Sequence, residues 1–335
     1  MSNLENILRN KISCKSVWFM RQAGRYLPEF RKIRSENKDF VKLCLNSELS
    51  SEITLQPIKR YNVDSAIIFS DILMVPYALG QKIEFIKNQG PKLSKFDTKC
   101  FSNSNKSNFL RKLSPIYRAI EITRKKLDKK KSLISFIGAP WTLLIYMFDI
   151  KKNEKEIDYD KLNSLKNFNQ VLNELTVYLC YHIENQINAG ANVVQIFDSW
   201  AGLIPNDKLE QYCFKPNAKI VSFCRNENIP NICFPKGIKK KYEDFNDFVR
   251  PDAINLDYEI DPMWAKQKLR NVVLQGGLDP KVLLKQDKEI YEGATKYIKA
   301  FNDIPYVFNL GHGLLPQTDP DKLNKLITFY RNFNE

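Results

Sequence analysis

Short runs of apolar and β-branched residues recur along the whole chain, separated by longer segments with a different period. Runs of four or five such residues, bounded by polar residues, are typical of strands buried on both faces. The segments between them carry apolar residues three or four positions apart, the period of an amphipathic helix; residues 172–187 are one example. Eight runs are predicted to be strands: Val17–Met20, Ala66–Phe69, Leu133–Ile137, Val193–Phe197, Asn231–Phe234, Ala253–Leu256, Val272–Gln275 and Val307–Leu310.

This alternation of strand and helix predicts a parallel sheet with helices outside it. Eight strand–helix units are the number that closes a (β/α)8 barrel of the TIM type, which typically needs about 250 residues. The chain has 335 residues and no linker rich in Gly, Ser or Pro, so we expect a single barrel domain over residues 1–335. An open, doubly wound sheet is the alternative.

Polar residues or glycines follow nearly every predicted strand. Ordinary turns would explain a Gly or an Asp, but they explain Arg, Asp, Ser, Lys and His together less well. In barrel enzymes the active site lies at the C-terminal ends of the strands, and we expect it there in this chain. The residues at these ends are, in chain order, Arg21, Ser70-Asp71, Gly138-Ala139-Pro140, Asp198-Ser199, Pro235-Lys236-Gly237, Asp257, Gly276-Gly277 and Gly311-His312-Gly313.

Four arginines gather in and after the end of the first run: Arg21, Arg25, Arg31 and Arg34. A guanidinium group holds a carboxylate or phosphate in a bidentate fork, so the cluster indicates a substrate with several negative charges. Pairing of these arginines with the protein's own Asp and Glu residues is an equally good interpretation of the spacing alone.

Composition limits the class of protein. The longest apolar stretches fall well short of the ~18 residues that a membrane span requires, so no membrane insertion is expected. Residues 1–10 lack the apolar centre of a secretory signal. Seven cysteines without a CxxC pair suit reduced thiols, and together these features predict a cytoplasmic protein without disulfides.

The formal net charge is +14, which raises the question of nucleic-acid binding. Much of the excess is lysine in loop-like or helix-end runs, for which solvated surface is the simplest explanation. Nucleic acid is therefore not an expected partner. The runs are Lys125-Lys126, Lys129–Lys131, Lys151-Lys152 and Lys239–Lys241.

No glycine fingerprint of the GxGxxG or P-loop type is present, so a nucleotide cofactor has no support. Cys180 and His182 form a C-x-H pair on a predicted helix, where residues two apart do not face each other. Zinc requires three or four convergent ligands, so no metal site is expected there. His182 is expected on the surface of the helix or in the core.

Five segments resemble the sequence motifs of uroporphyrinogen decarboxylases. They occur in that family's order between about residues 17 and 320, so the resemblance covers nearly the whole chain. The first is long and specific. The segments are Trp18–Arg31 (WFMRQAGRYLPEFR), Ile68–Leu73 (IFSDIL), Gly138–Leu143 (GAPWTL), Phe197–Gly202 (FDSWAG) and Asn309–Gly313 (NLGHG).

The resemblance implies a barrel enzyme without cofactor or metal, usually a homodimer. Such enzymes convert uroporphyrinogen III to coproporphyrinogen III in heme biosynthesis by decarboxylating four acetate side chains. The family's substrate-binding arginines fall on Arg21, Arg25 and Arg34, and its central pyrrole-binding aspartate falls on Asp71. The other substrate-binding or pocket-lining positions fall on Gln22, Phe69, Tyr146, Phe197, Ser199 and His312.

Asp71, Arg21 and Tyr146 are expected to act in catalysis. An ionised Asp71 would accept the pyrrole N–H bonds and stabilise the positive charge that a protonated pyrrole carries. Arg21 is effectively never deprotonated, so a binding or relay role suits it better than that of a free acid. Tyr146 and His312 are the chemical candidates for the proton donor, and we favour substrate binding for His312.

One position departs from the family, and two rival functions stay open. Gly277 stands where the family more often has an asparagine, and we expect a small effect on loop order. A zinc-dependent methyltransferase of related fold would need convergent His and Cys ligands, which a metal assay would test. A tetrapyrrole carrier would keep the arginines but would not need Asp71, which turnover would test.

Overall fold

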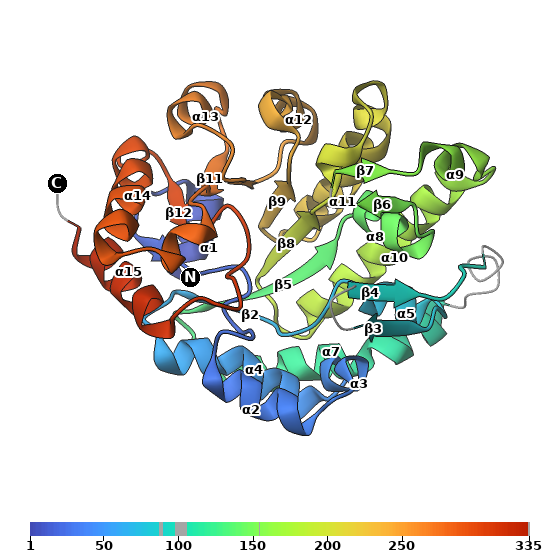
Figure 1. The fold of residues 1–335 in the computed structure, drawn as a ribbon, viewed down its shortest axis with the longest axis horizontal. Helices are drawn as coiled ribbons and strands as arrows, with labels where there is room; N and C mark the ends of the chain where they lie inside the picture. The colour runs from blue at the N-terminus through green and yellow to red at the C-terminus, as the bar shows by residue number, and fades with distance from the viewer. Residues whose placement is uncertain (87–89, 98–105, 154, 334–335) are drawn as a thin grey trace.

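The computed structural model describes residues 1–86, 90–97, 106–153 and 155–333. Its centre is an eight-stranded sheet in which all recorded pairs are parallel, in the order β1-β12-β11-β10-β9-β8-β5-β2 (Figure 1). The strands are β1 (Ser16–Val17), β2 (Ser65–Ile67), β5 (Ser132–Gly138), β8 (Val193–Asp198), β9 (Asn231–Pro235), β10 (Ala253–Leu256), β11 (Val273–Gly276) and β12 (Tyr306–Phe308).

The two ends of this strand order, β1 and β2, meet at Asp64. The backbone N–H of Asp64 donates to the carbonyl of Val17 at 2.9 Å, and the N–H of Val17 donates to the Asp64 carboxylate at 2.7 Å. Arg331, near the end of the chain, pairs with the same carboxylate at 2.6 Å. The ring is nearly closed, which confirms the (β/α)8 barrel and is contrary to the open sheet.

Each of the eight predicted runs overlaps an observed strand. The prediction works because strands of a parallel barrel are covered on both faces and so are continuously apolar. The largest shift is in β1, which was expected at Val17–Met20. Regular pairing ends early because the Met20 N–H donates to the side chain of Asn309 and not to the β12 backbone.

The helices form an outer ring around the strands (Figure 1). The predicted periodic segment at 172–187 lies in α10. The helices are α1 (Asn3–Asn10), α2 (Pro28–Glu36), α3 (Phe40–Cys44), α4 (Ser47–Arg60), α5 (Met74–Ala78), α7 (Lys106–Lys126), α8 (Pro140–Met147), α9 (Tyr159–Ser164), α10 (Phe168–Asn188), α11 (Lys215–Asn226), α12 (Tyr242–Val249), α13 (Pro262–Lys268), α14 (Asp287–Ala300) and α15 (Pro320–Asn332). Shorter helical turns are η1 (Ala201–Leu203), η2 (Asn206–Lys208), η3 (Glu210–Phe214), η4 (Lys239–Lys241) and η5 (Pro280–Leu284).

Helix α1 covers the N-terminal end of the barrel. Its apolar face, Leu4, Ile7 and Leu8, is buried in one cluster with inward-facing strand residues such as Val193 and Val307. The Ser2 side chain caps the helix and also bonds to Ser132 at the start of β5. Side chains therefore fill this end of the barrel, and the C-terminal ends of the strands remain for function.

Two antiparallel hairpins, which follow α5 and α8, were not predicted. One pairs β3 (Ile83–Ile86) with β4 (Gly90–Leu93), and the other pairs β6 (Lys151–Asn153) with β7 (Glu156–Ile157). The lysine run Lys151-Lys152 is predicted to be solvated surface. That is right for the exposed Lys152, but Lys151 is half-buried and places its ammonium 3.8 Å from the centre of the Trp200 ring.

The described lysines of the other runs are exposed as expected, apart from the half-buried Lys131. The six described cysteines are free thiols, which fits the expectation of no disulfides, while Cys100 lies outside the described residues. Among the described residues, no helix combines the length and apolar character needed to cross a membrane.

Candidate active site

Arg21 occupies a strained turn after β1. Its φ is +61°, a left-handed conformation that non-glycine residues seldom adopt unless their surroundings impose it. The turn is closed by the Gln22 N–H, which donates to the Phe19 carbonyl at 3.0 Å. A Cβ atom added to Gly313 would lie 2.4 Å from Cδ of Arg21, so the glycine leaves room for this arginine. The first and last sequence motifs therefore meet at the Arg21 side chain.

The Arg21 guanidinium interacts electrostatically with groups from several strand ends. Burial lowers the pKa of Arg21, Asp71 opposes that shift, Arg25 adds to it, and Tyr146 opposes it. The group nevertheless stays charged at any physiological pH. Residues that are 50 or more positions apart in the sequence are thus brought together at the C-terminal ends of β1, β2 and β5, which we call the mouth of the barrel.

Asp71 follows β2 and begins the turn into α5. Its Oδ1 accepts the N–H of Leu73 at 2.8 Å, and its carbonyl accepts the N–H of Met74 at 3.1 Å. Among the described residues no donor is recorded at Oδ2, and no Lys or Arg nitrogen lies within 4.0 Å of the carboxylate. Burial raises the pKa of Asp71 to about 6, although the hydrogen bond from the Leu73 N–H and the charge of Arg21 both act to lower it. The carboxylate is therefore mostly ionised at pH 7, with an oxygen available to a ligand.

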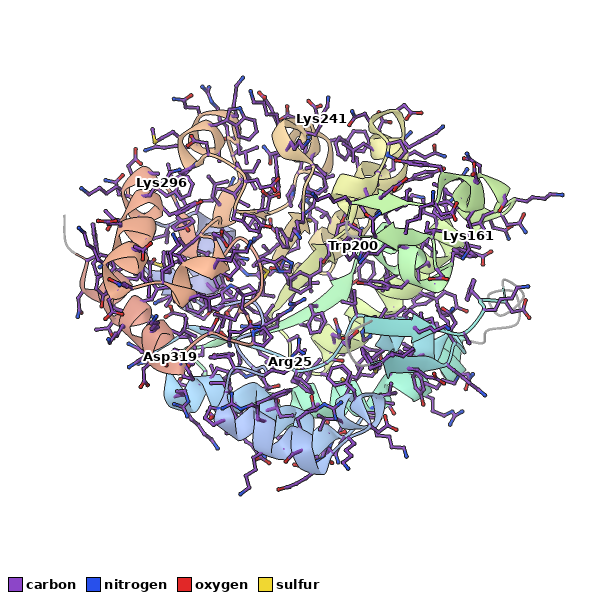
Figure 2. All side chains as sticks on the ribbon, viewed as in Figure 1. Arg25, Lys161, Trp200, Lys241, Lys296 and Asp319 are labelled. Carbon is purple, nitrogen blue, oxygen red and sulfur yellow. The ribbon has the colours of Figure 1, made fainter. Side chains whose placement is uncertain are left out.

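Tyr146 projects from α8 and is held by Trp200. The indole N–H of Trp200 donates to the Tyr146 hydroxyl at 3.0 Å, and the carbonyl of Trp200 accepts the indole N–H of Trp141 at 2.9 Å. The ammonium of Lys151 lies over the ring of Trp200. Figure 2 places Trp200 toward the middle of the ring of helices. These contacts fix the direction of the Tyr146 hydroxyl.

His312 follows β12 and is held in one protonation state. The N–H of Gly313 donates to its Nδ1 at 2.6 Å, so the neutral ring carries its proton on Nε2. Burial, together with the positive charges of Lys236 and Arg21, lowers the pKa of His312 to about 3. A neutral imidazole at pH 7 presents an N–H donor, the form suited to hold a carboxylate.

Two residues of β8 and its end face the same side by strand alternation. Phe197 is half-buried, and its ring meets that of Phe136 edge-on at 5.7 Å. Both rings pack on the cluster inside the barrel, so they form an apolar layer below the mouth. Ser199, two positions beyond Phe197, is half-buried above this layer.

Asp198 lies between them and turns the other way. It is 1% exposed, and its two oxygens accept the Thr142 hydroxyl at 2.7 Å and the Asn217 amide at 3.2 Å. Its carbonyl accepts the N–H of Lys236 at 3.1 Å. The sequence marked Asp198 only as a strand end, and it gave no sign of these partners, which come from α8 and α11.

The four clustered arginines form no close ion pairs with acids in the part of the chain that the structure describes. Among the described residues, none of them has an Asp or Glu oxygen within 4.0 Å, which is contrary to the interpretation that they pair with the protein's own acids. Arg31 donates to two backbone carbonyls of its own segment. Arg34 donates to the Asn37 carbonyl and lies 5.6 Å from the centre of the Phe40 ring. Arg25 is exposed and near the middle of the view in Figure 2.

Two of the predicted site residues are committed to the barrel wall. Gln22 is 1% exposed; its Oε1 accepts the N–H of Phe19 and its Nε2 donates to the carbonyl of Ser65. Phe69 is buried against two other phenylalanine rings. The amide of Gln22 joins the loop after β1 to β2, so it fixes where Arg21 stands relative to Asp71.

The unusual Gly277 is explained by its neighbour. Its φ is +100°, and a Cβ atom added there would lie 2.4 Å from the Tyr297 ring. The tyrosine ring thus occupies the space beside the glycine that any side chain at 277 would need. The expectation of a small effect on loop order stays a prediction.

The second histidine belongs to the core, one of the two places expected for it. His182 is 4% exposed in α10, and its two ring nitrogens meet the Tyr117 hydroxyl and the Gln186 amide, each at 3.0 Å. Within the described ranges, no group of three or more His, Cys, Asp or Glu residues is arranged to hold a metal ion.

Comparisons with known proteins agree with the motifs. The family model for uroporphyrinogen decarboxylase matches residues 3–333. A uroporphyrinogen decarboxylase of Rickettsia bellii is 39% identical over 328 residues, covering 95% of this chain and 94% of that protein. One from Orientia tsutsugamushi (strain Ikeda) is 40% identical over 324 residues, with the same coverage.

Among solved structures, a methyltransferase from Methanosarcina mazei has a TM-score of 0.77, with 15% identity over 98% of this chain and 97% of that one. This likeness shows a shared fold alone. The family match and the two relatives confirm the expected family and the expected class of enzyme, a carboxy-lyase. The chain belongs to the uroporphyrinogen decarboxylase family.

Proposed function

We propose that this protein decarboxylates the four acetate side chains of uroporphyrinogen III to give coproporphyrinogen III. Family membership supports the reaction class. The observation that carries the assignment of the site is the Asp71 carboxylate, which has one oxygen without a recorded protein donor and lies within electrostatic reach of Arg21.

The cations at the mouth suit the substrate. Uroporphyrinogen carries eight carboxylates, and Arg21, Arg25 and Arg34 supply guanidinium groups that are not neutralised by described acids of the protein. Charge-assisted bonds of this kind are roughly twice as strong as neutral ones. The net charge of +14 also attracts the polyanion over a distance and speeds its capture.

The pyrrole ring acts as the electron sink, and Asp71 is assigned to stabilise its positive charge. Protonation of a pyrrole ring carbon puts positive charge on the ring, the bond to the carboxylate then breaks, and its electrons return to the ring as carbon dioxide leaves. The resulting methylene takes up a proton to become methyl, and the ring loses one. At ~4 Å and an effective dielectric near 20, an ionised carboxylate stabilises such a cation by about 4 kcal/mol, or roughly three powers of ten in rate.

Tyr146 is the preferred proton donor among the groups at the mouth. Arg21 stays charged, so it binds a carboxylate or orders water. His312 is neutral, with Nε2–H as its donor, and its low pKa makes it a poor source of acid at neutral pH. His312 and Ser199 are assigned to substrate carboxylates, and Phe197 to the apolar layer beneath the macrocycle.

The working form is proposed to be a cytoplasmic homodimer without cofactor or metal. The rival of related fold, a zinc-dependent methyltransferase, makes opposite predictions for metal content. Elemental analysis of the purified protein separates the two, because stoichiometric zinc that is required for activity would refute the assignment. Light scattering tests the dimer against the mass of one 39.2 kDa chain.

Turnover is the direct test. The protein is incubated anaerobically with uroporphyrinogen III, the products are oxidised, and the porphyrins are separated by carboxylate number. We expect species with seven, six and five carboxylates to appear and then give way to four. A chain that binds the substrate but leaves all eight carboxylates intact would be a carrier, and the proposed function would be wrong.

A further inference from the structure

Lys236 directly follows β9 (Asn231–Pro235), a strand whose C-terminal end lies at the mouth of the barrel. Ile232 and Phe234 of this strand belong to the cluster that fills the barrel interior, and residues two apart on a strand face the same side. Lys236 comes two positions after Phe234, in the turn where the strand ends, and is half-buried. Its N–H donates to the Asp198 carbonyl, and its own carbonyl accepts the N–H of Gly202 at 2.9 Å, so its backbone is fixed.

Strand β9 stands opposite the arginines. In the ring order β1-β12-β11-β10-β9-β8-β5-β2, it is four strands from β1 in both directions. His312, at the end of β12, is influenced electrostatically by Lys236 and by Arg21. The histidine is therefore near both cations, which approach the mouth from opposite sides of the barrel.

We propose that Lys236 is a further substrate-binding residue, which holds a peripheral carboxylate of the tetrapyrrole on the side of the mouth opposite the arginines. The inference rests on the proposed function, because it concerns the same substrate. The carboxylates of the macrocycle surround its whole circumference, whereas Arg21, Arg25 and Arg34 all come from the segment after β1. A carboxylate brought into the mouth on the far side without a cation would lose hydration without compensation.

A lysine suits this position. Its ammonium is a compact charge on a flexible stem, so it can follow different carboxylates as the ring turns between successive decarboxylations. The same charge favours the neutral form of His312, which keeps the histidine as an N–H donor beside it. The two residues would then contact neighbouring carboxylates of one substrate.

The test compares Lys236→Met with Lys236→Arg and with a matched control, Lys240→Met. Lys240 is exposed in η4, four positions along the same segment, so its replacement removes an equal charge from the surface. We expect Lys236→Met to raise KM for uroporphyrinogen about tenfold or more, as loss of a charged hydrogen bond does, with kcat within a few-fold of wild type. Lys236→Arg should recover most of the affinity, and Lys240→Met should leave KM unchanged.

Binding of oxidised uroporphyrin, followed by fluorescence, separates this inference from the proposed function. This planar octacarboxylate is not a decarboxylation substrate, so its affinity reports the cation even if the protein turns out not to be a decarboxylase. Weaker binding by Lys236→Met alone supports the inference. Equal affinities for wild type, Lys236→Met and Lys240→Met would overturn it, as would a loss in Lys236→Met that Lys236→Arg does not recover.

The pKa values of the two histidines test the position of Lys236 without any ligand. In the NMR spectrum of Lys236→Arg and Lys236→Met, His182 of the core should titrate as in wild type. Loss of the Lys236 charge should raise the pKa of His312, and arginine should keep it low. An unchanged His312 pKa in a folded Lys236→Met protein would place the lysine away from the mouth and contradict the proposal.

Discussion

Two aspartates stand at the ends of β2 and β8, which are separated by β5 in the barrel, and burial raises the pKa of each to about 6. Asp71 follows β2 and is partly exposed, and among the described residues its carboxylate accepts one hydrogen bond, from its own turn. Asp198 ends β8, is 1% exposed, and accepts side-chain donors from Thr142 and Asn217 at its two oxygens. The Asp71 carboxylate keeps an oxygen for a ligand, whereas both oxygens of Asp198 accept hydrogen bonds from the protein.

The comparison shows that a perturbed pKa does not by itself mark a catalytic group. Structural networks and active sites both bury carboxylates and both raise their pKa. What separates the two aspartates is how many of their oxygens the protein itself satisfies. Variants at the two positions should therefore fail in opposite ways, one in rate and the other in stability.

The largest effect is expected for Asp71→Asn. The amide keeps the size of the side chain but removes the charge that stabilises the protonated pyrrole, so kcat should fall about 10³-fold. The measurement is single-turnover decarboxylation of uroporphyrinogen under anaerobic conditions. Turnover close to that of wild type would mean that Asp71 is not the electrostatic stabiliser.

The stability of the same variant supplies its control. A raised pKa means that the folded state binds the proton more tightly than the unfolded chain, so the contribution of Asp71 to stability falls as pH rises from about 4 to about 6. Asp71→Asn removes that cost and should be more stable than wild type at pH 7, by about 1–2 kcal/mol after allowance for partial exposure. The difference in the free energy of unfolding should disappear below pH 4.

The second largest effect is expected for replacement of Arg21. Because its backbone is strained, glycine and alanine at this position should differ in stability. Arg21→Gly removes the guanidinium and relieves the left-handed strain, whereas Arg21→Ala removes the same group and keeps the strain. Both should lower kcat/KM about 10²-fold, because a charged contact to substrate is lost. Arg21→Gly should unfold at the higher temperature of the two. Equal stabilities with full activity would contradict both the strain and the binding role.

Asp198→Ala should show the opposite pattern to Asp71→Asn. The hydroxyl of Thr142 and the amide of Asn217 would lose their acceptors in a buried site, which should lower the free energy of unfolding by about 2–4 kcal/mol. Urea denaturation measures the loss. Below the unfolding transition, kcat per folded molecule should stay within a few-fold of wild type. A large fall in kcat of a fully folded variant would show that Asp198 also acts in the reaction.

The sequence supports the fold more fully than the site. All eight strands were predictable, because strands covered on both faces have no polar alternation to confuse the pattern. The hydrophobic pattern alone cannot tell Asp71 from Asp198, since each simply follows an apolar run, and only the family resemblance singled out Asp71. What distinguishes them is supplied by helices far along the chain, α8 and α11.

Other parts of the site depended on the family resemblance or escaped prediction. Tyr146 sits in an apolar helix with no chemical pattern around it, so only the family resemblance pointed to it. The amide of Gln22 bonds to backbone groups within the barrel wall. The contact of Lys151 with Trp200 depends on a hairpin whose strands are too short and polar to be predicted from the sequence. Side-chain direction at a strand end is set by tertiary partners, which a single sequence does not reveal.

The smallest expected effect is the fall of kcat/KM at acid pH, which we call the acid limb of the pH profile. It compares the titration of Asp71 directly with that of Asp198. Activity requires an ionised Asp71, so kcat/KM should fall about tenfold for each pH unit below about 6. His312 is neutral well above its pKa of about 3, so its titration contributes nothing to the profile between pH 5 and 8.

The pKa of Asp198 is about 6, like that of Asp71, but Asp198 has no ligand-accessible oxygen. Its titration should therefore change the stability of the fold and not the rate. Asp198→Ala should therefore keep the limb at pH 6, and the residual activity of Asp71→Asn should lack it. Data above pH 5 avoid the titration of the substrate's own carboxylates, and a limb that survives in Asp71→Asn would have to belong to another group.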